Sequence, residues 1–344
     1  MTIHKDDFDV ALMPGKRAEL ADIYRVIRAS EAEVIATMRA GQADLGHLFE
    51  DVAACPACAR PADGAPAMYV KDGMHVVRCP GCGFVYSRQV FSQSYDQSRY
   101  ADPANENMYI RLKGHPVYAA LEDTKCAYVV QAIGAFAAPP GALLDVGSST
   151  GTLLVQAQRA GWTAHGLEAS AAQVAVARAK GLSAVQGYFP DALGTPAASA
   201  LPPRFNVITA LDVLEHMIDP LAFLARVRGA LVPGGVLAVQ VPNIDSLFIR
   251  LEGAANSNIC AGHWLYFSPA SLKALLARAG FTCLHLETYI TELDRAAAHA
   301  PAAIAAAFNA VTGRPRTAVG PPSATEVHNA LMGYKVFGLF RSSP

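Results

Sequence analysis

The sequence predicts an α/β fold with one seven-stranded, mostly parallel sheet and helices on both faces. Three observations support this prediction. Apolar segments of strand length alternate with helical segments from residue 141 onward, which is the rhythm of βαβ units. A turn of small residues, 147–151, joins the first of these strands to a helix. The 344 residues are 52% hydrophobic and 17% charged, which is enough to bury a large core.

Each predicted element has its own local evidence. Ser170 and Asp219 precede helical segments as N-caps, and Ser268-Pro269 begins a third that ends at Gly280. Another helix is expected near 151–160. The last strand is expected to run antiparallel to the others. The predicted strands are 142–146, 162–167, 183–187, 205–211, 236–241, 281–287 and 334–341.

Four parts of the chain differ in composition. Residues 1–52 form a predicted helical extension, because apolar side chains recur at helical spacing within 16–40. This helix could cover a pocket, pack on its own domain or pair with a second copy, so a homodimer is possible. The other parts are a cysteine-rich module at 53–90, a helical linker or lid at 91–140 and the α/β domain at 141–344, with an insertion near 294–330.

The cysteine-rich module has the spacing of a zinc ribbon. Cys55 and Cys58 form one C-x-x-C knuckle, Cys79 and Cys82 form another, and the 20 residues between them contain a hairpin-like segment with an Asp-Gly turn. Four thiolates close a tetrahedral Zn²⁺ shell without an open position, so we expect a structural site. A thioredoxin-like redox pair would explain one knuckle but not two.

The loop after the first strand predicts the chemistry of the cofactor. It reads Asp145-x-Gly147-x-Ser149-x-Gly151, and the next strand ends on Glu168, 23 positions after Asp145. A carboxylate at the end of the second strand can hold ribose hydroxyls. An acid at the first strand end repels phosphate but suits a cationic amino-acid group. We therefore expect S-adenosylmethionine, which carries a sulfonium and an ammonium group and no phosphate.

Charge and hydropathy exclude several classes of protein. A net charge of −1 supplies no basic surface for a phosphate backbone, so nucleic acid is an unlikely partner. No apolar run approaches the ~20 residues of a membrane span, and the first residues lack the apolar core of a signal peptide. These features predict a cytoplasmic protein without membrane contact, in which the seven cysteines are not disulfide-bonded.

These motifs together resemble class I S-adenosylmethionine-dependent methyltransferases, specifically a bacterial subgroup with an N-terminal zinc ribbon and a ubiquinone-biosynthesis-like catalytic domain. The resemblance covers about 55–290 and the last strand, and it implies a Rossmann-like fold. It further implies that Asp145, Gly147 and Gly151 line the methionine part of the cofactor. The matching segments are 55–58, 78–86, Tyr95 and Tyr100, 143–147, 211–220, 231–235, 263–268 and 279–281.

The same resemblance assigns the rest of the cofactor site. Glu168 would hold the ribose, and Leu211 with Asp212 would face the sulfonium. Two positions depart from the family pattern, because Ser149 replaces the middle glycine of the loop and the aspartate that often contacts adenine is absent. We expect Phe189 to stack on adenine in its place.

Catalysis then needs an aligned acceptor and, for a hydroxyl, a base. Glu215-His216 follows the fourth strand at the edge where ligands of such sheets bind, and in related methyltransferases this position faces the acceptor. His216 is the first candidate for the base, with Glu215 orienting it or helping to hold a divalent ion. His263, which precedes an aromatic segment, is the second candidate.

The predicted function is methylation of a small molecule, with a hydroxyl of a sugar or secondary metabolite as the acceptor. N- or C-methylation of a similar acceptor uses the same loop chemistry and stays open. So do methylation of RNA through the ribbon and a non-catalytic role as a cofactor-binding scaffold. The cofactors predicted are S-adenosylmethionine and a structural Zn²⁺.

Overall fold

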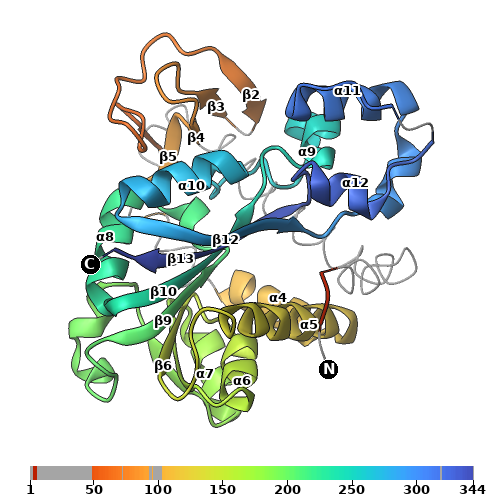
Figure 1. The fold of residues 1–344 in the computed structure, drawn as a ribbon. Helices are drawn as coiled ribbons and strands as arrows, with labels where there is room; N and C mark the ends of the chain where they lie inside the picture. The colour runs from red at the N-terminus through yellow and green to blue at the C-terminus, as the bar shows by residue number, and fades with distance from the viewer. Residues whose placement is uncertain are drawn as a thin grey trace.

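The computed structural model describes residues 3–5, 49–71, 73–92, 95, 103–317 and 320–343 (Figure 1). The helix predicted within 16–40, and Tyr100, lie outside the described residues.

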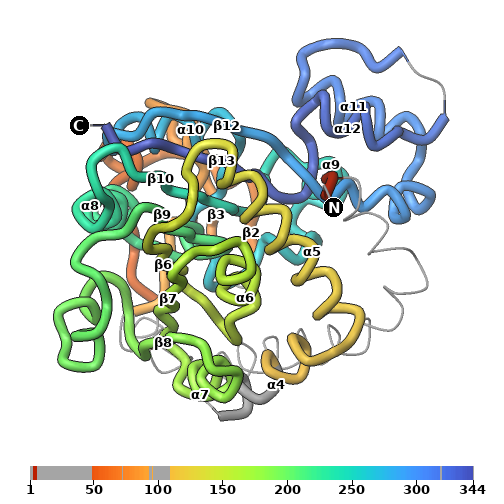
Figure 2. Tube along the Cα trace, turned by 60° about the horizontal axis from the view of Figure 1, so that its bottom comes forward, coloured from red at the N-terminus to blue at the C-terminus, as the bar shows by residue number. Residues whose placement is uncertain are grey.

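One large sheet organises the domain, and across the described residues it has seven strands in the order β12-β13-β10-β9-β6-β7-β8 (Figures 1 and 2). Strand β13 is antiparallel to both of its neighbours, and the pairs β10-β9, β9-β6, β6-β7 and β7-β8 are parallel. The predicted seven-stranded, mostly parallel sheet is therefore confirmed. Its strands are β6 (Ala142–Val146), β7 (Thr163–Glu168), β8 (Ser183–Gln186), β9 (Phe205–Leu211), β10 (Leu231–Pro242), β12 (Phe281–Tyr289) and β13 (Lys335–Ser342).

Helices cover both faces of this sheet, because alternate strand residues point to opposite sides. Leu143 packs in one buried cluster with α5 (Pro116–Ile133), α6 (Thr152–Arg159) and α7 (Ala171–Ala179). Its neighbour Leu144 packs in another cluster, with α8 (Pro220–Ala230) and α10 (Pro269–Arg278). The alternation of apolar residues along each strand thus builds two cores.

The helix boundaries follow the capping residues seen in the sequence. The Ser170 hydroxyl accepts a hydrogen bond from the Gln173 amide at the start of α7. Asp219 caps α8 in the same manner, and Ser268 begins α10 with a capping box. Two helices, α4 (Pro103–Gly114) and α5, lie within the predicted helical linker at 91–140.

The cysteine-rich module forms a second sheet. Its strands β2 (Ala67–Lys71), β3 (Met74–Arg78) and β4 (Val85–Ser87) pair in turn, and the hairpin between β2 and β3 is the one predicted. A fourth strand, β11 (Leu265–Tyr266), comes from the α/β domain and pairs with β4. Two further short strands, β1 (Phe49–Asp51) and β5 (Gln89–Phe91), pair with each other. The two sheets are thus joined by the chain between α9 and α10.

The insertion forms a small helical layer at one end of the sheet (Figure 1). Helix α9 (Leu247–Glu252) packs with α11 (Pro301–Thr312) and α12 (Ala324–Asn329) around a separate apolar cluster. Within the described ranges, no helix combines the length and the apolar character needed to cross a bilayer.

Candidate active site and metal centre

The loop after β6 adopts a conformation that favours glycine. Gly147 and Gly151 have φ values of 72° and 85°, and a Cβ on Gly151 would lie 2.4 Å from the Leu182 side chain. Ser149 has a φ of 50°, so it occupies the left-handed region at the position where the family has glycine. Its hydroxyl donates to the Gln173 carboxamide oxygen at 2.5 Å. The loop therefore keeps the shape that its glycines predict.

Glu168, at the end of β7, is fixed beside this loop. One carboxylate oxygen accepts from the Ser149 amide and the other from the Ser170 amide, each at 2.9 Å. Each carboxylate oxygen has two lone pairs, so both can still accept a further hydrogen bond. This geometry fits a group that holds the two hydroxyls of a ribose.

Asp145, at the end of β6, is 4% exposed and accepts a hydrogen bond from the Thr209 hydroxyl at 2.5 Å. Burial, with the nearby charge of Glu168 adding to it, raises the pKa of Asp145 to about 7. A cation placed beside this carboxyl would favour its charged form. The site therefore suits a positively charged group and disfavours a phosphate.

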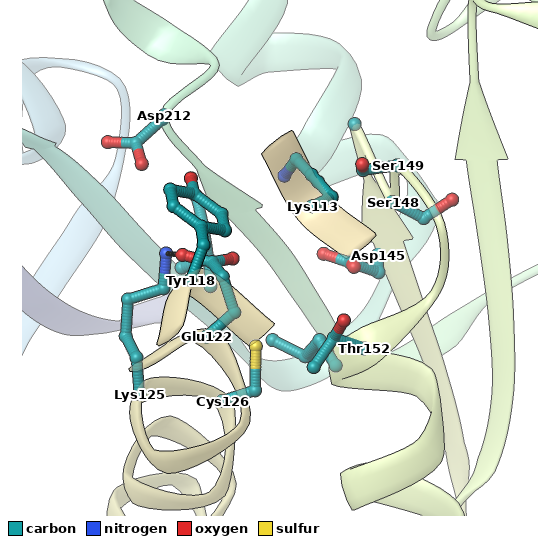
Figure 3. Close-up of a pocket in the computed structure, with 13 residues that line it drawn as sticks. Lys113, Tyr118, Glu122, Lys125, Cys126, Asp145, Ser148, Ser149, Thr152 and Asp212 are labelled. Atoms are coloured by element: carbon teal, nitrogen blue, oxygen red, sulfur yellow. Dashed lines mark hydrogen bonds and ion pairs between the residues drawn. The ribbon is translucent and has the colours of Figure 1, made fainter. Parts of the chain in front are cut away.

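A cavity lies between this loop and helices α4 and α5 (Figure 3). Five of the eight predicted cofactor residues line it: Asp145, Gly147, Ser149, Leu211 and Asp212. Gly151, at the end of the loop, and Glu168, beside it, are not among the lining residues. Neither is Phe189, whose ring meets the Phe223 ring edge-on at 5.5 Å between centroids.

The opposite wall of the cavity was not predicted. It consists of Lys113 from α4 and four side chains of α5, with Glu122 and Lys125 paired at 2.5 Å (Figure 3). Burial opposes ionisation of Glu122, but the charges of Lys125 and Lys113 and the hydrogen bond from Lys125 together lower its pKa. In the sequence, the only trace of this wall is a Glu-Lys pair three positions apart in a mostly apolar helical segment. The four α5 residues are Tyr118, Glu122, Lys125 and Cys126.

Asp212 follows β9 and is held by two strands. Its carboxylate accepts from the Gln240 carboxamide at 2.6 Å and from the Lys335 ammonium at 2.8 Å. Although burial opposes ionisation, these contacts and the charge of Lys335 hold the pKa of Asp212 well below its usual range. Lys335, at the start of β13, was not predicted as a site residue.

The three predicted catalytic side chains converge. Glu215 and His216 lie on the short helix η3 (Leu214–His216), His263 lies just before β11, and one nitrogen or oxygen of each lies within 4.8 Å of those of the other two. The imidazole rings meet at 71° with centroids 5.0 Å apart. The structure thus brings together residues that are 48 positions apart in the chain.

Two backbone carbonyls orient these imidazoles. Nδ1 of His216 lies 2.7 Å from the Gly262 oxygen, and Nδ1 of His263 lies 3.0 Å from the Asn258 oxygen. A carbonyl can only accept, so Nδ1 carries the proton in both rings and, when a ring is neutral, Nε2 carries the lone pair.

Burial governs the ionisation of the two neighbours of His216. It raises the pKa of Glu215 to about 8, with the charge of Asp212 adding to it. It lowers the pKa of His263 to about 3, together with the nearby His216. Both oxygens of the Glu215 carboxyl are buried and have no hydrogen-bond partner among the described residues. Glu215 and His263 are therefore predominantly uncharged at neutral pH.

The four ribbon cysteines form a second cluster. Their sulfurs all lie within 4.8 Å of one another, with Cys55 to Cys82 at 3.7 Å and Cys58 to Cys79 at 3.6 Å. A disulfide needs about 2.05 Å, whereas sulfurs 2.3 Å from a tetrahedral Zn²⁺ lie about 3.8 Å apart. Burial opposes ionisation of the Cys79 thiol, but hydrogen bonds from the Cys82 and Gly81 amides and from the Cys58 and Cys55 side chains together lower its pKa to about 7. The arrangement fits a Zn²⁺ ion.

Comparison with known proteins finds similarity to methyltransferases. Residues 118–286 match the family model of a methyltransferase domain. A ubiquinone biosynthesis O-methyltransferase of Bradyrhizobium is 32% identical over 116 residues, which are 33% of this chain and 45% of that protein. A protein of the same name from Cereibacter sphaeroides is 36% identical over 152 residues, 40% of this chain and 59% of that protein. The chain thus spans about half the length of the curated relatives it matches.

Among solved structures, a Thermotoga maritima S-adenosylmethionine-dependent methyltransferase, titled a possible histamine N-methyltransferase, has a TM-score of 0.44 at 18% identity. The match covers 69% of this chain and 95% of that chain. This similarity is too low to bear on function. The sheet order, the acid-edged cavity and the family match carry the assignment. Residues 118–286 therefore belong to the class I, S-adenosylmethionine-dependent methyltransferase domains.

Proposed function

We propose that this protein transfers a methyl group from S-adenosylmethionine to a hydroxyl of a small molecule. The observation that carries the proposal is that Glu215 and His216 directly follow β9, the strand whose last residue, Leu211, lines the cofactor cavity, and that His263 converges on them. The relatives' names describe O-methyltransferases, which supports a hydroxyl acceptor.

The cofactor would be held by side chains that complement its charged groups and its ribose hydroxyls. Glu168 would accept from the ribose hydroxyls, and Asp145 would face the ammonium group. Lys113, whose ammonium lies 5.9 Å from the centre of the Tyr118 ring at the cavity wall, offers a cation to the cofactor's carboxylate. When bound, S-adenosylmethionine supplies a methyl group already activated by a sulfonium.

His216 would then take the proton of the acceptor hydroxyl. The bond between Nδ1 and the Gly262 carbonyl sets the tautomer in which Nε2 can accept that proton. Glu215 and His263 surround it with uncharged groups, so a neutral hydroxyl can approach without meeting a buried charge. The acceptor we favour is a sugar or secondary metabolite.

Two measurements test the proposal in order. Calorimetry of the full, zinc-loaded chain with S-adenosylhomocysteine should register binding, and a nicotinamide or flavin nucleotide should register none. Radiolabelled S-adenosylmethionine should then label at least one member of a panel of hydroxylated small molecules. Cofactor binding with no transfer to hydroxyl, amine or carbon acceptors would indicate a scaffold instead, and salt-dependent retention of RNA would indicate a nucleic-acid substrate.

A further inference from the structure

One short segment, 258–264, holds all three groups of the catalytic cluster. The backbone carbonyls of Gly262 and Asn258 accept from the imidazoles of His216 and His263, respectively. The backbone amide of Trp264 donates to the backbone carbonyl of Glu215 at 2.9 Å. Any change in the path of this segment therefore changes the orientation of both imidazoles.

The zinc ribbon anchors this segment from the other side. The Ser87 amide donates to the Trp264 carbonyl at 2.8 Å, and β4 pairs with β11 directly after it. The Trp264 ring also meets the Phe91 ring edge-on at 4.9 Å between centroids. Strand β4 is thus the structural link between the ribbon and the segment.

The metal ligands are coupled to β4 through the backbone. Cys82 lies three residues before this strand, and the Cys79 amide donates to the Phe84 carbonyl at 2.8 Å. A module this small depends on its metal to hold such knuckles in place. The chain of contacts therefore runs from the four sulfurs through β4 and β11 to the Gly262 carbonyl.

We infer that the zinc ribbon is a positioning element for the catalytic imidazole, acting through the β4–β11 pairing that holds the Gly262 carbonyl against His216. The inference rests on the proposed function for the role of His216. The described lining of the cofactor cavity comes from α4, α5, the loop after β6, the start of α6 and the carboxyl ends of β6 and β9, not from the ribbon. Loss of zinc should therefore disturb His216 and spare cofactor binding.

The first experiment compares the zinc-loaded full chain with the same protein after chelation, using three readouts that need no acceptor. Hydrogen exchange of the 262–266 amides should accelerate at least about tenfold without zinc. Nitrogen NMR should show His216 leaving the single Nδ1-H tautomer, with His216→Gln providing the resonance assignment. Calorimetry should show an S-adenosylhomocysteine affinity within about twofold of the loaded protein.

The second experiment breaks the link and leaves the metal in place. Ser87→Pro removes the amide that donates to Trp264. Ser87→Ala keeps this amide and loses the hydroxyl, which donates to the Gln89 carbonyl and accepts from the Gln89 amide. Ser87→Pro should bind one zinc and S-adenosylhomocysteine normally but show the exchange and tautomer changes of the zinc-free protein. Ser87→Ala should match the wild type.

Two outcomes would overturn the inference. Zinc-free protein that keeps the His216 tautomer and slow exchange at 262–266 would show that the ribbon does not position the cluster. Parallel loss of S-adenosylhomocysteine binding would show that zinc supports the whole fold. Failure of the proposed function has a different signature, because the zinc-loaded wild type would then bind no S-adenosylhomocysteine or transfer no methyl group.

Discussion

The two halves of the candidate site are built in different ways. The cofactor half, made of the loop after β6, Glu168 and Asp212, lies at successive strand ends of one parallel sheet. The catalytic half, made of Glu215, His216 and His263, depends on a two-residue strand that joins a different sheet. The first half is a property of the fold, and the second depends on how the zinc ribbon docks on it.

The halves also differ in charge. Asp212 is ionised because Lys335 compensates it, and Asp145 can ionise when a cation arrives. Glu215 and His263 are kept uncharged by burial. A cationic donor on one side and a neutral acceptor on the other match this division. The predictions that follow test whether the two halves can be damaged separately.

The largest effect is expected from His216→Gln. Removal of a general base lowers kcat by about 10²- to 10⁴-fold, while the affinity for S-adenosylhomocysteine should stay within about twofold because His216 does not line the cofactor cavity. Steady-state kinetics with the labelled acceptor and calorimetry with the cofactor product measure the two quantities. Intact turnover in this variant would move the role of base to His263, for which His263→Gln is the matched variant.

The next largest effect is expected from Glu168→Gln, which should act on the cofactor half alone. An amide nitrogen cannot accept from the Ser149 or Ser170 amides, and it loses the charge that strengthens the ribose contacts. We expect S-adenosylhomocysteine to bind about 10- to 100-fold more weakly by calorimetry. Gln173→Ala removes only the contact to the Ser149 hydroxyl and is the control. Unchanged affinity in Glu168→Gln would mean that the ribose is held elsewhere.

A smaller effect is expected from pH. The raised pKa of Asp145, about 7, means that this carboxyl is mostly protonated at pH 6 and mostly charged at pH 8. Binding of a cation favours the charged form, so S-adenosylhomocysteine affinity should rise about tenfold between pH 6 and pH 8, with release of a proton. In the absence of cofactor, the pH dependence of folding stability has the opposite sign. The raised pKa means that folded Asp145 holds its proton more tightly than the unfolded chain does, so this contribution to stability is lost as pH rises through the folded pKa.

Calorimetry in buffers of different ionisation enthalpy counts the released protons, and Asp145→Asn should bind without this pH dependence. A wild-type affinity that is flat from pH 6 to pH 8 would contradict the role given to Asp145.

The smallest effect is expected from Ser149→Gly. Glycine relieves the left-handed backbone at φ 50°, worth about 1 kcal/mol, but it loses the hydrogen bond to Gln173, worth a similar amount. Thermal unfolding and cofactor affinity should therefore change little, by less than about threefold in Kd. Ser149→Val should weaken binding strongly, because a branched side chain does not tolerate this φ. A large gain in affinity with glycine would mean that Ser149 narrows the cofactor's approach.

Most of the fold could be predicted because its signals are local. Strands 142–146 and 205–211 match β6 and β9 residue for residue, and Ser170, Asp219 and Ser268 cap helices as expected. The cofactor loop and the four cysteines were identified from spacing within short segments. Such features can be predicted from the periodicity of apolar residues and from the residue types that turns and helix caps require.

The rest of the site depends on contacts between distant residues. Lys335 reaches Asp212 across 123 positions, and β11 is two residues long, too short for any periodicity to show. The α5 wall was missed because its buried ion pair gains meaning only when the helix is placed over the loop. Phe189 illustrates the reverse case, since its ring contacts Phe223 and its predicted contact with adenine stays a prediction.

Strand β13 has a consequence for synthesis of the chain. It inserts between β10 and β12 and carries Lys335, yet it is the last of the seven strands to leave the ribosome. Until it emerges, β10 and β12 present open edges and the Asp212 carboxylate has no lysine partner. The nascent polypeptide therefore completes this edge of the sheet only after β13 has been synthesised, and a chain truncated before Lys335 would expose both edges to aggregation.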